Sequence, residues 1–314
     1  MNRKMKLLLA AAVSIAATGM AQEIIPGSTG FTSPYIDGDL AGQQGWGDVL
    51  NSGTNAFNVT DAAGTGYVDT VSTVLSTNGN YAYLDSTALG SAAGDEWDGV
   101  MDFTISTTTN AIDHSDFFRI GLSTVNTNGL GNNADDIALR VRSQSNGGLY
   151  VRTYGGGASV DLLEVDKTAL GWDPAATNQV TDDLRLSWKL RETTVADTYT
   201  LVCSLENLTT PYTNTSAGVS MVCSNAYASS GLYTLMGREN QAFIGTNQVD
   251  EINITIDNLS IIKSTAQPVK LYPTPVSVDA GNAVVDLSWP DVAEALTYTV
   301  SRSDTIDGVY GTLI

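Results

Sequence analysis

The 314-residue chain carries 34 acidic and 15 basic side chains, a formal net charge of −19, and 42% of its residues are apolar. Such an excess of carboxylates repels phosphate backbones, which are bound by lysine and arginine displacing counterions, so the composition excludes a nucleic-acid partner. A single histidine, His114, and two cysteines without CxxC spacing leave no ligand set typical of a zinc site.

Residues 1–21 have the three parts of an export signal. The basic start Asn2-Arg3-Lys4-Met5-Lys6 precedes the apolar residues 7–17, and Gly19-Met20-Ala21 gives a cleavage site with small residues. The apolar run is shorter than the roughly 20 residues that span a membrane. We therefore expect a secreted or cell-surface protein without a membrane span in the mature chain, which keeps 12 basic and 34 acidic residues.

Short alternating runs of Val, Ile, Thr, Tyr and Phe dominate residues 54–262 and are separated by Gly, Asn, Asp and Ser. This pattern is typical of half-buried strands and their turns. The strands it predicts lie at residues 55–60, 66–72, 81–85, 99–106, 117–123, 137–143, 149–154, 160–165, 184–192, 198–205, 219–223, 231–236 and 252–262. We expect residues 22–263 to form one large antiparallel β-sandwich, making the chain an all-β protein.

A linker and a second module follow the predicted sandwich. Residues 264–275 contain three of the eight prolines and show no clean alternation, which is typical of an extended linker. Residues 284–289 and 296–302 alternate again and predict two further strands in a module over residues 276–314. Because 39 residues fall below the roughly 40 that fold unaided, we expect a partial module, with further C-terminal modules missing.

Three segments of residues 22–263 resemble the concanavalin A-like lectin and glucanase superfamily, in particular the laminin-G-like jelly rolls of secreted bacterial proteins. They are the opening Gly30-Phe31 through Tyr35-Ile36-Asp37-Gly38-Asp39-Leu40 to Gly45-Trp46, the strand at 183–191, and the closing strand Ile254-Thr255-Ile256-Asp257-Asn258-Leu259-Ser260-Ile261. The resemblance implies a jelly roll that binds a polysaccharide or a surface glycan, and a fold that often holds calcium.

The C-terminal residues resemble the first half of a fibronectin type III domain. The likeness rests on Val285-Asp286-Leu287-Ser288-Trp289, on Tyr298-Thr299-Val300-Ser301-Arg302-Ser303 and on Gly308-Val309-Tyr310. It implies that Trp289 and Tyr298 are core residues of a spacer without chemistry of its own.

An acidic segment, Asp95-Glu96-Trp97-Asp98-Gly99-Val100-Met101-Asp102, is the candidate for catalysis. Laminarinase-like members of the superfamily carry their carboxylates as Glu-x-Asp-x-Glu or Glu-x-Asp-x-x-Glu, which would require Glu at Val100 or Met101. Strand geometry separates Asp98 from Asp102 by about 13 Å unless a bulge intervenes, beyond the roughly 9.5 Å of an inverting pair. Glu96 and Asp98, about 6.6 Å apart by the same rise, reach only the lower edge of the inverting range. We therefore expect no catalytic residues; Glu96, Asp98 and Asp102 are the candidates if the protein is an enzyme. The alternative is an acidic turn that enters a core strand.

The few positive charges cluster in the middle of the sequence. Period-two alternation puts Arg140 with Arg142 on one strand face and Tyr150, Arg152 and Tyr154 on another. If the loop at 144–148 makes a hairpin with Arg142 opposite Tyr150, Arg140 lies opposite Arg152, and such like-charge pairs are unfavourable without nearby anions. In the same way, Arg185, Lys189 and Arg191 alternate with buried leucines.

Our hypothesis is that these strands share a sheet whose polar face binds a glycan, either neutral or anionic. Arginine forks would pair with its sulfates or carboxylates, and Tyr150 and Tyr154 would stack on its rings. The alternative is an ordinary wet sheet face, neutralised by Asp116, Asp161, Glu164 and Asp183.

Three further features complete the predicted sites. Asp37 and Asp39 are candidate ligands of a structural calcium ion, although their spacing departs from the Asp-x-Asp-x-Asp-Gly loop. Cys203 and Cys223 lie in neighbouring candidate strands about a turn near Tyr212-Thr213-Asn214, so an exported chain could join them in a disulfide, the alternative being two buried thiols. Tryptophans are generally core residues, but Trp172, beside Gly171 and Asp173-Pro174 in a loop, is the candidate for an exposed ligand platform.

The sequence favours a secreted, noncatalytic, carbohydrate-binding or adhesive jelly roll. The alternatives are a glycoside hydrolase of the laminarinase-like kind, which needs converging carboxylates in an open cleft, and a structural surface protein without a ligand.

Overall fold

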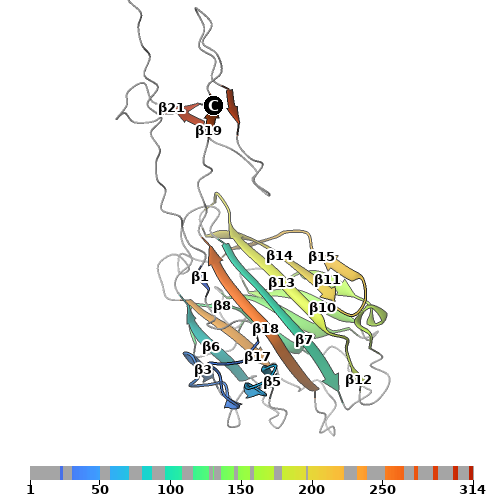
Figure 1. Cartoon of the computed structure of the whole chain (residues 1–314). Coiled ribbons are helices and arrows are strands. Elements are labelled where there is room, and N and C mark those ends of the chain that lie inside the picture. Colours follow the sequence, from blue (N-terminus) through green and yellow to red (C-terminus); the bar gives the residue numbers. More distant parts are fainter. Residues whose placement is uncertain are drawn as a thin grey trace, which may run out of the picture. The chain divides into compact units, whose positions relative to one another are not determined.

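The computed structural model (Figure 1) describes residues 22–23, 30–49, 57–70, 80–86, 96–107, 116–126, 130, 136–144, 148–155, 159–172, 179–195, 197–222, 232–238, 252–264, 272–274, 286–288, 300–302 and 311–313. The chain divides into two compact units, Met20–Ala266 and a second that includes Gln267–Ile314. In the first unit the described residues form two antiparallel sheets, which confirms the predicted all-β sandwich.

The larger sheet has eleven described strands, and Figure 1 shows three long members, β13, β7 and β18, side by side. The path of the sheet runs through β15 (Tyr212–Thr215), β14 (Thr198–Asn207), β13 (Leu184–Glu192), β7 (Glu96–Thr107), β18 (Ile252–Ser264), β5 (Tyr67–Thr70), β4 (Phe57–Thr60) and β2 (Gly38–Asp39). Three more strands pair with this path: β1 (Gln22–Glu23) with β18, β12 (Gln179–Val180) with β7, and β16 (Val219–Val222) with β14.

The smaller sheet has seven described strands. Their order is β11 (Asp161–Val165), β10 (Leu149–Gly155), β9 (Ile137–Ser143), β8 (Asp116–Ser123), β17 (Leu232–Arg238), β6 (Asn80–Ser86) and β3 (Trp46–Val49). Every pairing within it is antiparallel.

One continuous apolar core holds the two sheets together. In β13 burial alternates without a break, with Leu184, Leu186, Trp188 and Leu190 buried and the residues between them half-buried. Facing strands of the other sheet contribute residues such as Leu139 of β9 to the same core. Each fully buried Leu contributes about 1.5–3 kcal/mol to stability. The core therefore fixes which face of every strand points outward.

The predicted strands at 137–143 and 184–192 match β9 and β13 residue for residue. Two expectations are wrong. The turn placed near Tyr212 is the start of β15, so β14 pairs first with β15 and then with β16. The strands that carry the basic residues do not share one sheet, because β13 lies in the larger sheet and β9 and β10 in the smaller.

The second unit contains two short strand pairs among its described residues. β19 (Tyr272–Thr274) pairs with β20 (Asp286–Ser288), and β21 (Val300–Arg302) pairs with β22 (Gly311–Leu313). Residues 272–274, which we expected to be linker, are therefore part of a sheet. Trp289 and Tyr298 lie outside the described residues.

No helix in the described parts of the chain has the length and hydropathy needed to cross a membrane. The helix described in the first unit is a single 3-10 turn, η1 (Lys167–Leu170).

Candidate functional site

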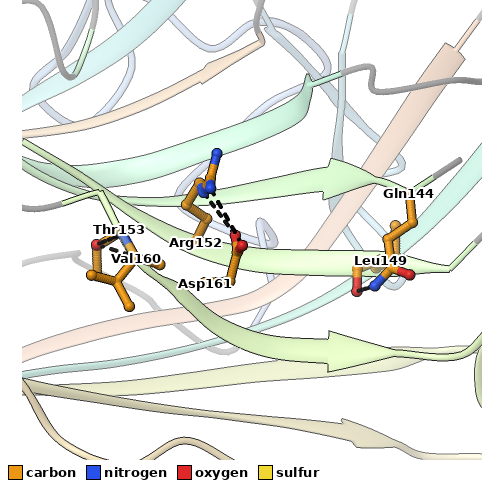
Figure 2. A network of polar contacts seen from close by, with 6 residues as sticks. All are labelled: Gln144, Leu149, Arg152, Thr153, Val160 and Asp161. Atoms are coloured by element: carbon orange, nitrogen blue, oxygen red, sulfur yellow. Dashed lines mark hydrogen bonds and ion pairs between the residues drawn. The ribbon is translucent and has the colours of Figure 1, made fainter.

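The β9–β10 hairpin has the register expected from its sequence. Arg140 lies directly opposite Arg152, and Arg142 directly opposite Tyr150. Gln144 closes the loop, because its backbone N–H donates to the carbonyl of Gly148 (2.8 Å) and its Nε2 to that of Leu149 (3.0 Å, Figure 2). The two arginines of the first pair are half-buried, as are Arg142 and Tyr150.

A third arginine extends this pair into a row. Arg119 of β8 lies directly opposite Arg140, so three neighbouring strands present arginine at the same level. The residues flanking these positions, such as Ile120 and Leu139, are buried in the core. Arg119, Arg140 and Arg152 therefore form an arginine row on the outer face, which is the face of the seven-stranded sheet that points away from the core.

Asp161 of β11 ends the arginine row at the sheet edge. Its Oδ1 lies 2.7 Å from Nε of Arg152, and Nη2 of Arg152 donates to Oδ2 at 3.3 Å (Figure 2). The side chains are 30% and 44% exposed. This ion pair is therefore open to solvent on both sides.

A β-bulge places Asp161 at that position. The β10–β11 register shifts between Val151 and Arg152, so that Arg152 faces Asp161 instead of Leu162. Thr153 fixes the bulge, since its N–H donates to the carbonyl of Val160 (2.9 Å) and its Oγ1 accepts from the N–H of Val160 (2.9 Å, Figure 2). Bulges of this kind re-aim side chains at sheet edges.

A parallel row lies one step along the strands. It consists of the positions Asp116, Arg142, Tyr150 and Glu164 on β8, β9, β10 and β11. The two rows together place four arginines and one tyrosine among three acidic residues. Counted by residue type, these positions carry a small net positive charge, whereas the whole chain has a net charge of −19.

Leu130 covers the middle of the outer face. Its side chain is fully buried against Tyr81, Ala138 and Leu235, and its carbonyl accepts a hydrogen bond from Nη1 of Arg119. Arg119 is consequently only 5% exposed. The part of the arginine row that a ligand can reach is therefore Arg140 and Arg152, at the β9–β11 end.

The outer face also holds aromatic residues that the sequence analysis did not single out. Tyr83 of β6 and Tyr233 of β17 are half-buried and meet edge to face, with ring centroids 5.7 Å apart. Gly47 makes room for Tyr83, because a Cβ at that position would collide with the ring. The alternation Tyr81-Ala82-Tyr83 was the signal that could have placed these rings on one face.

The candidate catalytic carboxylates lie on the outward face of β7, in the other sheet. Asp102 is 7% exposed and receives two hydrogen bonds from Arg185, Nε at 2.7 Å and Nη2 at 2.9 Å, and a third from Nδ2 of Asn258 at 2.9 Å. Oε1 of Glu96 lies 2.6 Å from Nη2 of Arg191. The carboxylate of Asp102 also raises the pKa of Arg185 through its hydrogen bond.

These contacts do not bring Asp98 and Asp102 together. The β7–β13 register is unbroken from Glu96 to Phe103, so Asp98 and Asp102 stay about 13 Å apart along the strand. The bulge that could have shortened this distance lies instead on β18, between Asp257 and Ser260. Asp98 lies opposite Lys189. The three carboxylates thus face three cations of β13 in register, as charge partners.

Trp172 is a core residue, which corrects its assignment as an exposed platform. It is 5% exposed and packs edge to face on Phe117, with ring centroids 6.0 Å apart. Gly171, with φ +65°, ends the short helix η1 in the left-handed conformation and turns the chain inward. The described tryptophans Trp46, Trp97 and Trp188 are buried too, as expected.

Asp37 and Asp39 are exposed and organise their own loop. Oδ1 of Asp37 accepts the N–H of Ala62 at 2.7 Å, and Oδ1 of Asp39 accepts the N–H of Ala41 at 3.1 Å. Within the described residues, no group of three or more His, Cys, Asp or Glu side chains could hold a metal ion. The expected calcium ion stays a prediction.

Cys203 is a free, buried thiol. Burial raises its pKa to about 12, against a smaller lowering by a hydrogen bond with Ser216. Cys223 lies outside the described residues, so the expected disulfide stays a prediction.

The remaining predicted ligand-binding residue is Tyr154, which lies opposite Ala138 in β10. Its side chain lies outside the described residues. Of the predicted set, the structure brings Arg140, Arg142, Tyr150 and Arg152 together on one face.

No protein-family model matches the sequence, and no curated protein matches it. Several solved structures are similar to the chain. They include the basic winged bean lectin with Tn-antigen (TM-score 0.47, 8% identity, covering 79% of this chain and 99% of that one). Arcelin-5, a lectin-like defence protein from Phaseolus vulgaris, has a TM-score of 0.43 and 9% identity over 74% of this chain and 98% of its own.

An alginate lyase in complex with alginate tetrasaccharide is also similar, with a TM-score of 0.40 and 14% identity over 78% of this chain and 97% of that one. Because these TM-scores lie below 0.5, the likenesses assign no function.

Proposed function

We propose that the chain is a secreted or cell-surface carbohydrate-binding protein, without catalytic function, that binds its ligand on the outer face of the seven-stranded sheet. The binding site is the β9–β11 end of that face. The observation that carries the proposal is the placement of Arg140 opposite Arg152, with Tyr150 in the adjacent row.

The residue types at this end suit a sugar chain. A half-buried tyrosine offers an apolar ring for the C–H face of a sugar and keeps its hydroxyl in water. Guanidinium groups supply planar arrays of donors for hydroxyl or anionic oxygens. Both kinds of group come from strands whose register is fixed by the core, so the backbone positions of the site are set by the sheet.

The noncatalytic part of the proposal is supported by the ion pairs on β7. Asp102 accepts hydrogen bonds from Arg185 and Asn258, so its carboxylate serves as a charge partner within the sheet. Export is supported by residues 1–21, which lie outside the described residues, and the fibronectin type III-like spacer and the structural calcium remain parts of the proposal.

The test is affinity electrophoresis of the full chain through gels containing a panel of neutral and charged polysaccharides. We expect at least one polymer to retard the protein and Tyr150→Ala to weaken the binding about tenfold, the value of one good stacking contact. Tyr150→Phe keeps the ring and should keep the binding. Tyr212→Ala, on the other sheet, is the matched control and should bind as the wild type does. Retardation by no polymer, or equal retardation of Tyr150→Ala and the wild type, would refute the proposal.

A further inference from the structure

The two sheets arrange their outward cations in opposite ways. On β7 and β13, Arg185, Lys189 and Arg191 each lie opposite a carboxylate, namely Asp102, Asp98 and Glu96. On β8, β9 and β10, the arginine row sets Arg119 opposite Arg140 and Arg140 opposite Arg152. Like charges directly opposite each other are unfavourable. An anion near the row relieves that repulsion, and Asp161 supplies one at the sheet edge.

The Arg152–Asp161 ion pair is more exposed and held by fewer contacts than the Arg185–Asp102 ion pair. Asp161 is 44% exposed, and the contacts described for its carboxylate come from Arg152. Asp102 has a side chain only 10% exposed and is also held by Asn258. An exposed ion pair contributes little to stability because water solvates both partners. An incoming anion can therefore take the place of Asp161 at little cost.

The negative charge of the whole chain does not oppose such a ligand at close range. Exposed charges farther away than the Debye length, about 8 Å at physiological ionic strength, are largely screened. Close to Arg152, on its own strand or a neighbouring one, the ligand meets Arg140, Arg142 and Tyr150 together with Asp161 and Glu164. The charges near Arg152, and not the net charge of the whole chain, therefore act on the ligand at this site.

Resting on the proposed function, we infer that the carbohydrate is an acidic polysaccharide, whose carboxylate or sulfate groups replace Asp161 on Arg152 and bridge it to Arg140. Tyr150 then stacks on a sugar ring beside the charged group. In the absence of ligand, the carboxylate of Asp161 occupies Arg152, and it competes with the anionic groups of the ligand for this arginine.

The experiment measures binding of the full chain in 0.15 M salt to matched polymers. Dextran sulfate is compared with dextran, and polygalacturonate with its methyl ester, so that each pair differs only in charge. Polyglutamate is the polyanion without sugar. The inference predicts at least tenfold tighter binding of an acidic polymer than of its neutral partner, with the sulfate and carboxylate arms showing which group is preferred, and weak binding of polyglutamate.

Single-residue variants test the inference more specifically than the comparison of polymers does. Asp161→Asn frees Arg152 and should tighten binding of the acidic polymer severalfold, whereas Arg152→Gln should weaken it. Glu206→Gln, exposed on the other sheet, removes the same charge and should leave affinity unchanged; circular dichroism checks that each variant is folded.

Three results would overturn the inference. They are equal binding of charged and neutral partners, polyglutamate binding as tight as that of the acidic polysaccharide, and an Asp161→Asn affinity no higher than that of Glu206→Gln. Tyr150-dependent binding of a neutral polymer alone would leave the proposed function standing and reject the acidic ligand. Binding of no polymer would reject both.

Discussion

Arg140 of β9 and Arg152 of β10 lie directly opposite each other on the outer face of the seven-stranded sheet, at one level with Arg119 of β8. Like charges directly opposite each other are unfavourable in a sheet. Arg140→Glu would place a carboxylate between two arginines and should raise the free energy of unfolding by about 0.5–1 kcal/mol, while abolishing binding of acidic polysaccharide. Urea unfolding measures the first effect. Arg142→Glu, opposite Tyr150, is the control; an Arg140→Glu variant no more stable than this control would contradict the account.

In contrast to the like-charged arginine row, the Asp102–Arg185 pair joins opposite charges and should stabilise the fold. Asp102→Asn removes the negative charge and one of the two nearly buried oxygens that together accept three hydrogen bonds, and it should lower the free energy of unfolding by about 1.5–3 kcal/mol. Glu206→Gln, also opposite Arg185 but exposed, should change it by less than about 0.5 kcal/mol. Equal unfolding midpoints for the two variants would show that the pair contributes nothing.

Asp257 should make stability depend on pH. It lies opposite Asp102, and burial first, then the charges of Asp102 and Asp183, raise its pKa, against a lowering by the N–H of Asn258. A raised pKa means that the folded protein holds this proton more tightly than the unfolded chain. The favourable contribution is therefore present below the ordinary value of 3.8 and is lost as the pH rises through the raised pKa.

Asp257→Asn keeps an acceptor for that N–H and removes the charge. It should be more stable than the wild type at pH 7, and the difference should shrink at pH 3.5. Urea unfolding at the two pH values checks this, with Glu206→Gln as the control, because Glu206 is exposed and is not among the groups that shift the pKa of Asp257. A wild type more stable than Asp257→Asn at pH 7 would reverse the sign and refute the explanation.

Variants of Trp172 distinguish a structural role of this residue from a role in ligand binding. Because the ring is buried against Phe117, Trp172→Ala should lower the free energy of unfolding by about 3–5 kcal/mol. Trp172→Phe should recover part of the loss and bind polysaccharide as the wild type does. A Trp172→Ala protein of normal stability that has lost binding would restore the platform assignment.

Local pattern was sufficient for the parts of the site that depend on neighbouring residues. The Arg140–Arg152 register follows from a short loop and period-two alternation, and both are visible in the sequence. The outward direction of Glu96, Asp98 and Asp102 follows from the same alternation in β7.

Long-range pairing could not be predicted in this way. Asp102 meets Arg185 across 83 positions of sequence, and nothing in either strand specifies the other as its partner. Because local pattern does not specify such pairing, the sequence predicted β13 in one sheet with β9 and β10, whereas it lies in the other sheet. Trp172 was misplaced because the left-handed Gly171, which directs the ring into the core, looks like any loop glycine in the sequence.

The most direct test of the central claim compares two double variants that remove the same charge. Arg140→Gln with Arg152→Gln acts on the outer face of the seven-stranded sheet, and Arg185→Gln with Arg191→Gln on the other sheet. Titration calorimetry with an acidic polysaccharide should show at least a tenfold loss of affinity for the first and wild-type affinity for the second, both folded by circular dichroism. Equal affinities for the two variants, or loss confined to the second, would contradict the account.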